Sequence, residues 1–541
     1  MKLLTVLRAL RSLAARLASR TLIVLALGVL AAAQAATGPL DLSTATILDL
    51  QAALEAGTIT SEKLMQLYLA RIDAYNQQGP KLNAIIMLTK DPLADARALD
   101  VERKTKGSRG PLHGIPILVK DVYDVQGLPT AGGFKPMAQS FPARDAFIIA
   151  KLRAAGAVIF GKLNQSDWFA IAPTAGSTIQ GSVRNPYNPL YSPGGSSSGT
   201  GASVSAWLCA AGLGSDTNGS VQNPSAECNL YGMVATRGVV SRTGQISSSF
   251  TQERAGPLCR SMTDLAVMLT YMAGFDAEDL VTAKSLGMLP AQPYTAFLKK
   301  DALKGARIGV LRSLFRGGPE LTEGRRLTEA ALVRMKAAGA ILVDPVGVDF
   351  DLPAALVDAN LSMLERKPTH NWYLSRLPAG SPIRSVDEMI AKAGDTKLKA
   401  AVFESNALPP LDQYQPYLAR LKQQEMIRDA LVGLMKKYEL DVLVYPYKLD
   451  SAAKLSDPAA EGGGDRLAAT GVVNVSPRTG LPALCAPAGL TKDGLPISLE
   501  FLGAPFSEPT LIAIGYAYEQ ASPPREPPPT TPALPGETIA D

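Results

Sequence analysis

Apolar residues along this chain recur with two different spacings. In residues 44–78 they recur every three or four positions, which indicates amphipathic helix, and Thr60-Ser61 supplies a capping residue. Residues 146–153 repeat the helical spacing, and the short apolar run at 157–160 predicts a strand directly after it. The pattern therefore predicts helices and strands that alternate.

The second half of the chain continues this alternation. Apolar runs predict strands at 306–311, 341–343 and 441–445, and helical spacing predicts helices at 325–338 and 418–437. Strands that alternate with helices are typical of α/β proteins with a largely parallel sheet. There is neither an internal repeat nor a clear linker, so we expect one domain over residues 37–522.

The first 36 residues differ from the rest of the chain. A basic segment ends at Arg20, residues 21–30 are apolar, and Ala33-Gln34-Ala35 fits a small-residue cleavage site. This order predicts a secretory signal peptide in residues 1–36, because the apolar run is shorter than the ~20 residues of a membrane anchor. We therefore expect export to the periplasm or the medium, with no stable membrane association after cleavage.

Glycine and proline mark two further segments. Residues 461–465 read Glu-Gly-Gly-Gly-Asp, which predicts a flexible loop. Residues 523–541 contain three consecutive prolines, a composition that does not build a core. We therefore expect residues 523–541 to form a disordered tail.

Charge and cysteine content narrow the classes of function. The chain has 54 basic and 49 acidic side chains, and five of the basic ones lie in residues 1–36, so the remainder is balanced. A balanced domain does not predict nucleic-acid binding. Four cysteines without a C-x-x-C pair, together with two histidines, do not form a common zinc motif. We expect buried free thiols at the cysteines, which are Cys209, Cys228, Cys259 and Cys485.

Candidate chemistry is concentrated in two serine-bearing, glycine-rich segments, residues 194–201 and 214–220. With so few histidines, a lysine is the leading candidate for the base of a serine nucleophile, and Lys120 follows an apolar run. Burial would lower the pKa of a lysine enough to keep it neutral. A glycine turn before Ser220 can direct several N–H groups into one hollow that holds an oxyanion.

Each of these residues also has an ordinary structural interpretation. Serines after Gly194-Gly195 can cap a helix predicted over residues 201–211, and Ser220 can be a solvated turn residue. Lys120 can be a surface residue paired with Asp121.

The serine segments resemble those of the amidase signature family of serine hydrolases. Further matches lie at residues 111–116, 120–121, 161–164, 185–189, 255–258, 479–483 and 494–496, so that the resemblance extends over residues 44–520. It implies a large mixed central sheet covered by helices on both faces. It also implies amide hydrolysis through an acyl-enzyme, without a metal or an organic cofactor.

The resemblance assigns roles to individual residues. Ser220 corresponds to the nucleophile, Ser196 to a bridging serine held by a cis peptide bond, and Lys120 to the base. The N–H groups of Thr217, Asn218, Gly219 and Ser220 correspond to the oxyanion hole. The implied substrate is a small-molecule or peptide amide.

Two departures from the family pattern bear on the substrate. Asn218 replaces the usual glycine, and polar residues occur there in peptide amidases of this family. Gln222 stands where many members have arginine, which makes a substrate with a carboxylate less favourable. We therefore expect small neutral amides or C-terminal peptide amides as substrates.

Two other functions are compatible with parts of the sequence. The chain could be an amidotransferase-type subunit that depends on partner subunits, although a signal peptide argues against that cytosolic role. Residues 195–199 also fit the G-x-S-x-G motif of α/β-hydrolases, with Ser197 as nucleophile and His370 as its late histidine. For His113 we expect a structural hydrogen-bonding role.

Overall fold

The computed structural model describes residues 40–169, 176–316, 321–394, 408–455 and 474–539. The predicted signal peptide and the predicted loop at 461–465 lie outside these residues. None of the helices in the described ranges combines the length and apolar character needed to span a bilayer.

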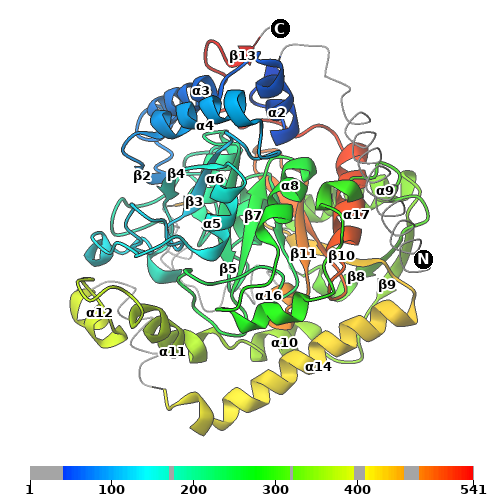
Figure 1. Ribbon diagram of the computed structural model, residues 1–541. Coiled ribbons are helices and arrows are strands. Elements are labelled where there is room, and N and C mark those ends of the chain that lie inside the picture. The colour runs from blue at the N-terminus through cyan, green and yellow to red at the C-terminus, as the bar shows by residue number, and fades with distance from the viewer. Residues whose placement is uncertain (1–39, 170–175, 317–320, 395–407, 456–473, 540–541) are drawn as a thin grey trace, which may run out of the picture.

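A mixed sheet of 11 strands forms the centre of the described residues (Figure 1). In spatial order the strands are β2 (Ile85–Leu88), β4 (Val158–Leu163), β3 (Pro116–Lys120), β5 (Ala211–Asp216), β7 (Arg254–Cys259), β6 (Tyr231–Val234), β11 (Ala483–Leu490), β12 (Pro496–Leu502), β10 (Val442–Lys448), β8 (Arg307–Leu311) and β9 (Ile341–Val346). β3 pairs in parallel with β4 and β5, and β8 does so with β9 and β10. The remaining pairs are antiparallel.

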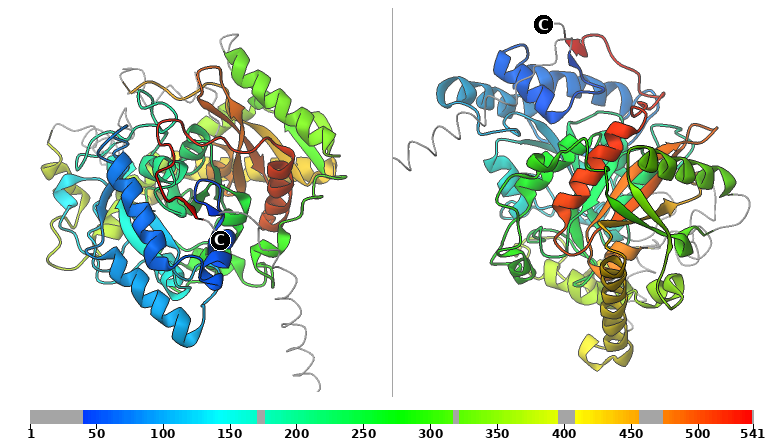
Figure 2. Two further views of the ribbon diagram at one scale, coloured as in Figure 1. Left: turned by 90° about the horizontal axis from the view of Figure 1, so that it is seen from above. Right: turned by 90° about the vertical axis from the view of Figure 1, so that its right-hand side faces the viewer.

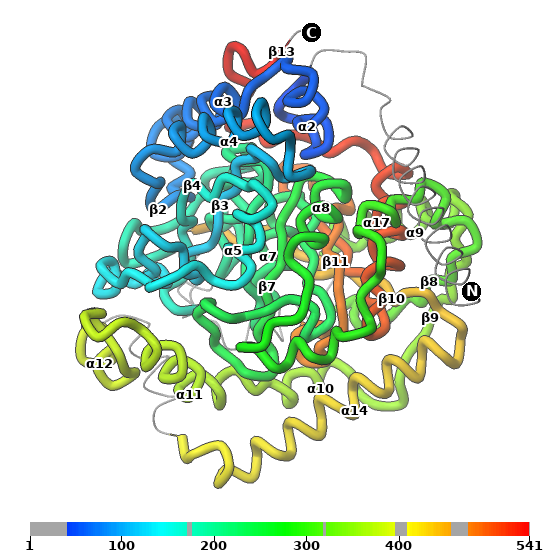
Figure 3. Tube along the Cα trace, in the orientation of Figure 1, coloured from blue at the N-terminus to red at the C-terminus, as the bar shows by residue number. Residues whose placement is uncertain are grey.

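Helices cover both faces of this sheet. They are α2 (Ile47–Ala56), α3 (Ser61–Tyr75), α4 (Pro92–Lys106), α5 (Phe147–Ala154), α6 (Ser198–Ser205), α7 (Gln222–Glu227), α8 (Met262–Met272), α9 (Thr322–Ala337), α10 (Leu352–Asp358), α11 (Ser362–Leu374), α12 (Val386–Lys392), α14 (Gln415–Lys437), α16 (Val475–Thr479) and α17 (Glu508–Ala521). Short 3-10 helices are η1 (Lys135–Met137), η2 (Asp167–Phe169), η3 (Leu280–Ser285), η4 (Tyr294–Phe297), η5 (Arg312–Leu314) and η7 (Leu411–Gln413). Figure 3 shows α10, α11, α12 and α14 on the side of the molecule opposite α2, α3 and α4.

The helices and strands predicted from apolar spacing are present, with shifted ends. The predicted helix over 44–78 is two helices, because Gly57 ends α2 with a φ of 76° that other residues adopt at a cost. Thr60 caps α3 as expected, since its side chain accepts a hydrogen bond from the N–H of Lys63. The helix predicted over 201–211 instead spans 198–205, and β5 begins at Ala211.

The expectation of a largely parallel sheet is wrong. The strands predicted at 306–311, 341–343 and 441–445 do form parallel pairs. The centre of the sheet, however, consists of β5, β7, β6, β11 and β12, which pair in antiparallel fashion. The mixed sheet implied by the family resemblance is therefore the correct one.

The predicted disorder of residues 523–541 is also wrong as far as Ile539. β13 (Thr538–Ile539) pairs with β1 (Leu40–Asp41), and Figure 2 shows this C-terminal segment lying across the N-terminal helices. Arg71 on α3 forms a buried ion pair with Glu537 at 2.8 Å. The prolines prevent regular structure, but a buried arginine and strand pairing still hold the segment in place.

Candidate active site

Lys120 is the last residue of β3 and is completely buried. Its strand lies between β4 and β5 in the central sheet. Nζ donates a hydrogen bond to Ser196 Oγ at 2.7 Å and another to Ser215 Oγ at 3.0 Å. The ring centroid of Phe169 lies 5.0 Å from Nζ.

The protonation of Lys120 follows from this environment. Burial lowers the pKa of the Lys120 amine to about 7, because a charged ammonium loses its hydration there, while the Glu253 and Asp216 carboxylates act in the opposite direction. A lysine with this pKa is substantially neutral near pH 7 and can accept a proton. The surface interpretation of Lys120 is therefore wrong, and Asp121 pairs instead with Lys162 at 2.9 Å.

Ser196 lies just before α6 and is 8% exposed. The peptide bond between Gly195 and Ser196 is cis, as the family resemblance predicts. The side chain of Asn223 holds the backbone at this position, because its Oδ1 accepts a hydrogen bond from the N–H of Gly195 at 2.8 Å. Ser197, the helix N-cap residue, makes no side-chain capping bond, so the capping interpretation fails for that serine.

Ser220 is partly exposed and follows a tight turn between β5 and α7. The buried carboxylate of Asp216 closes this turn by accepting the N–H groups of Gly219 at 3.0 Å and Val221 at 2.8 Å. Gly219 has a φ of 90°, and a Cβ there would lie 2.4 Å from the Tyr447 hydroxyl. The turn therefore requires glycine at position 219.

The structure brings Lys120 and Ser196 into contact, whereas Ser220 hydrogen-bonds to neither of them among the described residues. Catalytic hydrogen bonds often form only when substrate is bound.

Of the four predicted oxyanion donors, one already has a hydrogen-bond acceptor within the protein. Gly219 cannot offer a free N–H because that group already donates to Asp216. For Thr217, Asn218 and Ser220 we find no hydrogen-bond acceptor of the backbone N–H within the described ranges. Three candidate donors therefore remain instead of four.

The alternative triad around Ser197 is not formed. Ser197 Oγ donates to the carbonyl of Ser215 at 3.3 Å. His370 packs edge-on against Trp168, with ring centroids 4.9 Å apart, and neither ring nitrogen has a hydrogen-bond partner among the described residues. Burial lowers the pKa of His370 well below its usual value, so it remains a neutral core residue.

The other residues considered above have structural roles. His113 accepts a hydrogen bond from the N–H of Arg109 through Nδ1, and its Nε2 lies 2.9 Å from the carbonyl of Leu99, as expected. All four cysteines are buried free thiols, which confirms that prediction. Across the described part of the chain, no group of three or more metal-ligating side chains is placed to hold a metal ion.

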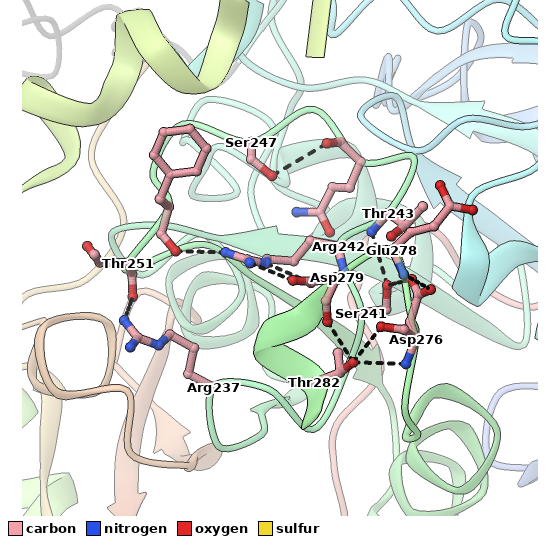
Figure 4. Close-up of polar contacts among 12 residues, drawn as sticks. Arg237, Ser241, Arg242, Thr243, Ser247, Thr251, Asp276, Glu278, Asp279 and Thr282 are labelled. Atoms are coloured by element: carbon pink, nitrogen blue, oxygen red, sulfur yellow. Dashed lines mark hydrogen bonds and ion pairs between the residues drawn. The ribbon is translucent and has the colours of Figure 1, made fainter. Parts of the chain in front are cut away.

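A small cavity of about 140 Å³ lies elsewhere on the molecule. It is bounded by Arg242, Asp279, Phe250 and Trp372, and by none of the predicted triad residues. Arg242 pairs with Asp279, as Figure 4 shows, and it also donates to the carbonyl of Phe250. Its charge is thus already neutralised within the protein.

Sequence reasoning missed several residues that contact the predicted site. Ser215 lies within the second serine segment, but nothing in the pattern marked it as a partner of Lys120. The side chain of Gln252 donates to the carbonyl of Thr217 and to Asn218 Oδ1, each at 3.0 Å. Arg478 also donates to Asn218 Oδ1. Gln252 and Arg478 lie just outside the family matches at 255–258 and 479–483, so no motif marked them.

Comparison with known proteins identifies the family. A buried lysine bonded to two serine hydroxyls in an α/β fold indicates a hydrolytic enzyme, and the profile of the amidase family matches residues 63–512. One subunit of the glutamyl-tRNA(Gln) amidotransferase of Chloroflexus aurantiacus is 33% identical over 489 residues, covering 88% of this chain and 96% of that protein. The chain belongs to the amidase family and is an amide-hydrolysing enzyme.

Solved structures agree with this assignment. The peptide amidase of Stenotrophomonas maltophilia superposes with a TM-score of 0.80 at 33% identity, covering 89% of this chain and 98% of that one. An amidase family protein from Bacillus anthracis has a TM-score of 0.79 at 30% identity, covering 90% of this chain and 92% of that one.

Proposed function

We propose that this enzyme hydrolyses small neutral amides or C-terminal peptide amides through Ser220, Ser196 and Lys120. The hydrogen bond from the buried Lys120 amine to Ser196 Oγ carries the proposal. An amine whose pKa is about 7 can take the Ser196 proton while Ser196 takes that of Ser220. Ser220 Oγ then attacks the amide carbon and forms an ester.

The charge that develops on the carbonyl oxygen needs fixed donors. The N–H groups of Thr217, Asn218 and Ser220 adjoin the nucleophile and have no other acceptor in the described residues. The proton held by Lys120 returns through Ser196 to the departing amine, and water then hydrolyses the ester by the same relay. Every step uses side chains and backbone groups of this chain.

Two observations support a neutral substrate. Gln222 is completely buried and uncharged at the position where many family members have arginine. The Arg478 guanidinium is itself engaged, since it donates to Asn218 Oδ1 and to the carbonyl of Leu356. The similarity to a peptide amidase is consistent with peptide amides as one substrate class.

We further propose that the protein is exported. Within residues 1–36 a basic segment, an apolar segment and small residues follow one another, in the order typical of a signal peptide.

A dependent amidotransferase-type subunit is the second candidate, favoured by the identity to one component of such an enzyme. The purified lone chain distinguishes the two functions. Under our proposal it releases ammonia from a panel of primary and peptide amides, and an absence of turnover for every amide would favour the dependent subunit.

The nucleophile is tested separately with a fluorophosphonate probe, whose site of attachment is read by mass spectrometry. We expect labelling at Ser220, loss of labelling in Ser220→Ala, and retained labelling in Ser197→Ala. Labelling that persists in Ser220→Ala would show that another residue is the nucleophile.

A further inference from the structure

Gln252 is a buried side chain that connects the turn at residues 216–220, which carries Ser220, to the residue before α11 and to α14. It is 1% exposed and lies in the loop before β7. Its Nε2 donates to the carbonyl of Thr217 and to Asn218 Oδ1, both at 3.0 Å. Its Oε1 accepts the N–H of Leu361 at 2.7 Å and Nε2 of Gln424 at 3.2 Å. Both the amide nitrogen and the amide oxygen of Gln252 therefore make hydrogen bonds.

The bond to Thr217 has a consequence for Asn218. The carbonyl of Thr217 and the N–H of Asn218 belong to one planar trans peptide group, so they point in opposite directions. When Gln252 holds the carbonyl on one side, the N–H of Asn218 is directed to the other side. A hydrogen bond to the carbonyl also polarises the peptide and makes its N–H a stronger donor.

Hydrogen bonds also fix the next two peptide groups, which carry the N–H groups of Gly219 and Ser220. The carbonyl of Gly219 accepts the N–H of Asn223 at 2.7 Å, which directs the N–H of Ser220 away from Asn223. The N–H of Gly219 is taken by Asp216. The carbonyls opposite the N–H groups of Asn218 and Ser220 are therefore both anchored, the first by a side chain and the second by the backbone of α7.

The loop that carries Gln252 is itself firmly held. Arg237 donates to the backbone carbonyl of Thr251 at 2.6 Å (Figure 4), and Arg242 donates to that of Phe250 at 2.7 Å. Glu365 on α11 accepts the N–H and the hydroxyl of Thr251, at 3.1 and 2.9 Å. Gln252 is thus presented from a fixed backbone and loses little freedom when it binds the turn.

The side chain of Asn218 completes the contact. Besides Gln252, its Oδ1 accepts from Arg478, and its Nδ2 donates to Ser362 Oγ at 2.9 Å. A glycine, the more usual residue at this position, would make none of these bonds. Asn218 therefore reinforces the position of its own peptide group.

From these contacts we infer that Gln252 is a positioning residue that aims the N–H of Asn218 at the developing oxyanion. The inference rests on the proposed function, because it takes Ser220 as the nucleophile. Losing one oxyanion donor costs about 10²–10³-fold in kcat, so a misdirected donor should cost about 10–100-fold. KM should change little, since the ground-state amide oxygen depends less on this donor.

The test compares Gln252→Met with Gln252→Glu, which keeps the acceptor for Leu361 but loses both donations to the turn. We expect both variants to lower kcat for a peptide amide by about 10–100-fold. Affinity for a matching peptide aldehyde, which forms an oxyanion on Ser220, should fall by a similar factor. Affinity for the corresponding alcohol, which forms none, should stay unchanged.

Gln51→Met is the matched control, because Gln51 is a buried glutamine that donates to the carbonyl of His113 at 2.7 Å. It should leave kcat unchanged. Equal losses of aldehyde and alcohol affinity, or an unchanged kcat in both Gln252 variants, would overturn the inference. If the unaltered protein is labelled by the fluorophosphonate elsewhere than at Ser220, the proposed function fails and the inference fails with it.

Discussion

Two buried lysines on neighbouring strands have different partners. Lys162 on β4 and Lys120 on β3 are both fully covered. Lys162 contacts the Asp121 carboxylate at 2.9 Å and the Thr130 hydroxyl at 3.3 Å. Among the described residues, the hydrogen bonds of Lys120 go to serine hydroxyls, at 2.7 and 3.0 Å. A carboxylate partner gives Lys162 a structural ion pair, whereas a buried lysine without a direct carboxylate partner more readily loses its proton and becomes an amine that can act as a base.

The largest expected effect comes from Lys120→Met. Methionine fills the same space but cannot accept a proton, so kcat should fall by about 10²–10⁴-fold. Stability should respond differently. Between pH 7 and 10.5 the folded protein binds fewer protons at Lys120 than the unfolded chain, so stability rises with pH across that window.

In Lys120→Met this pH dependence of stability should disappear, and the free energy of unfolding at pH 7 should equal or exceed that of the unaltered protein. Denaturant unfolding at several pH values measures both quantities. A large loss of stability in Lys120→Met would mean that the two lysines are equivalent.

The reciprocal change is Lys162→Met. It leaves the Asp121 carboxylate buried without its cation, which should lower the free energy of unfolding by about 3–5 kcal/mol. Asp121 also accepts the N–H of Gly133 at 3.0 Å, so the loop at residues 131–133 should loosen as well. Urea unfolding gives the magnitude, and unaltered stability would show that this pair is not required.

A smaller effect is expected at another buried cation, Arg71. Glu537→Gln removes the charge of its partner but keeps an oxygen acceptor, and Arg71 retains bonds to the carbonyls of Ala206 and Thr531. We expect a loss of about 1–3 kcal/mol. Proteolysis within residues 523–539 should accelerate in parallel. An unchanged cleavage rate would contradict the role assigned to this pair in holding the C-terminal segment.

The spacing of apolar residues was sufficient to predict some strands of the central sheet and not others. β8, β9 and β10 were predicted because they contain runs of branched apolar residues. β5 and β11 are rich in glycine, alanine and proline, which have low strand propensity, and they were missed. Burial on both faces of a large sheet stabilises such strands despite their composition. Single-sequence spacing does not reveal that burial.

In the candidate site, too, some residues could be predicted from the sequence and others could not. Motif spacing identified Lys120 and Ser196. The amine of Lys120 hydrogen-bonds to the hydroxyl of Ser196, although the two residues are 76 positions apart in the sequence. It could not reveal Gln252, because its contacts with Thr217 and Asn218 span 35 and 34 residues and belong to no motif. The prediction that residues 523–541 are disordered failed for a related reason. The composition of this segment does not reveal that Glu537 has a buried ion-pair partner, Arg71, on α3.

The pH dependence of kcat/KM for a neutral primary amide tests the central claim most directly. This parameter reports the ionisation of the free enzyme, and the substrate has no titrating group. If Lys120 acts as an uncharged base, kcat/KM falls as the pH drops, with a midpoint near the Lys120 pKa of about 7. A profile that stays flat down to about pH 5 would contradict a lysine base.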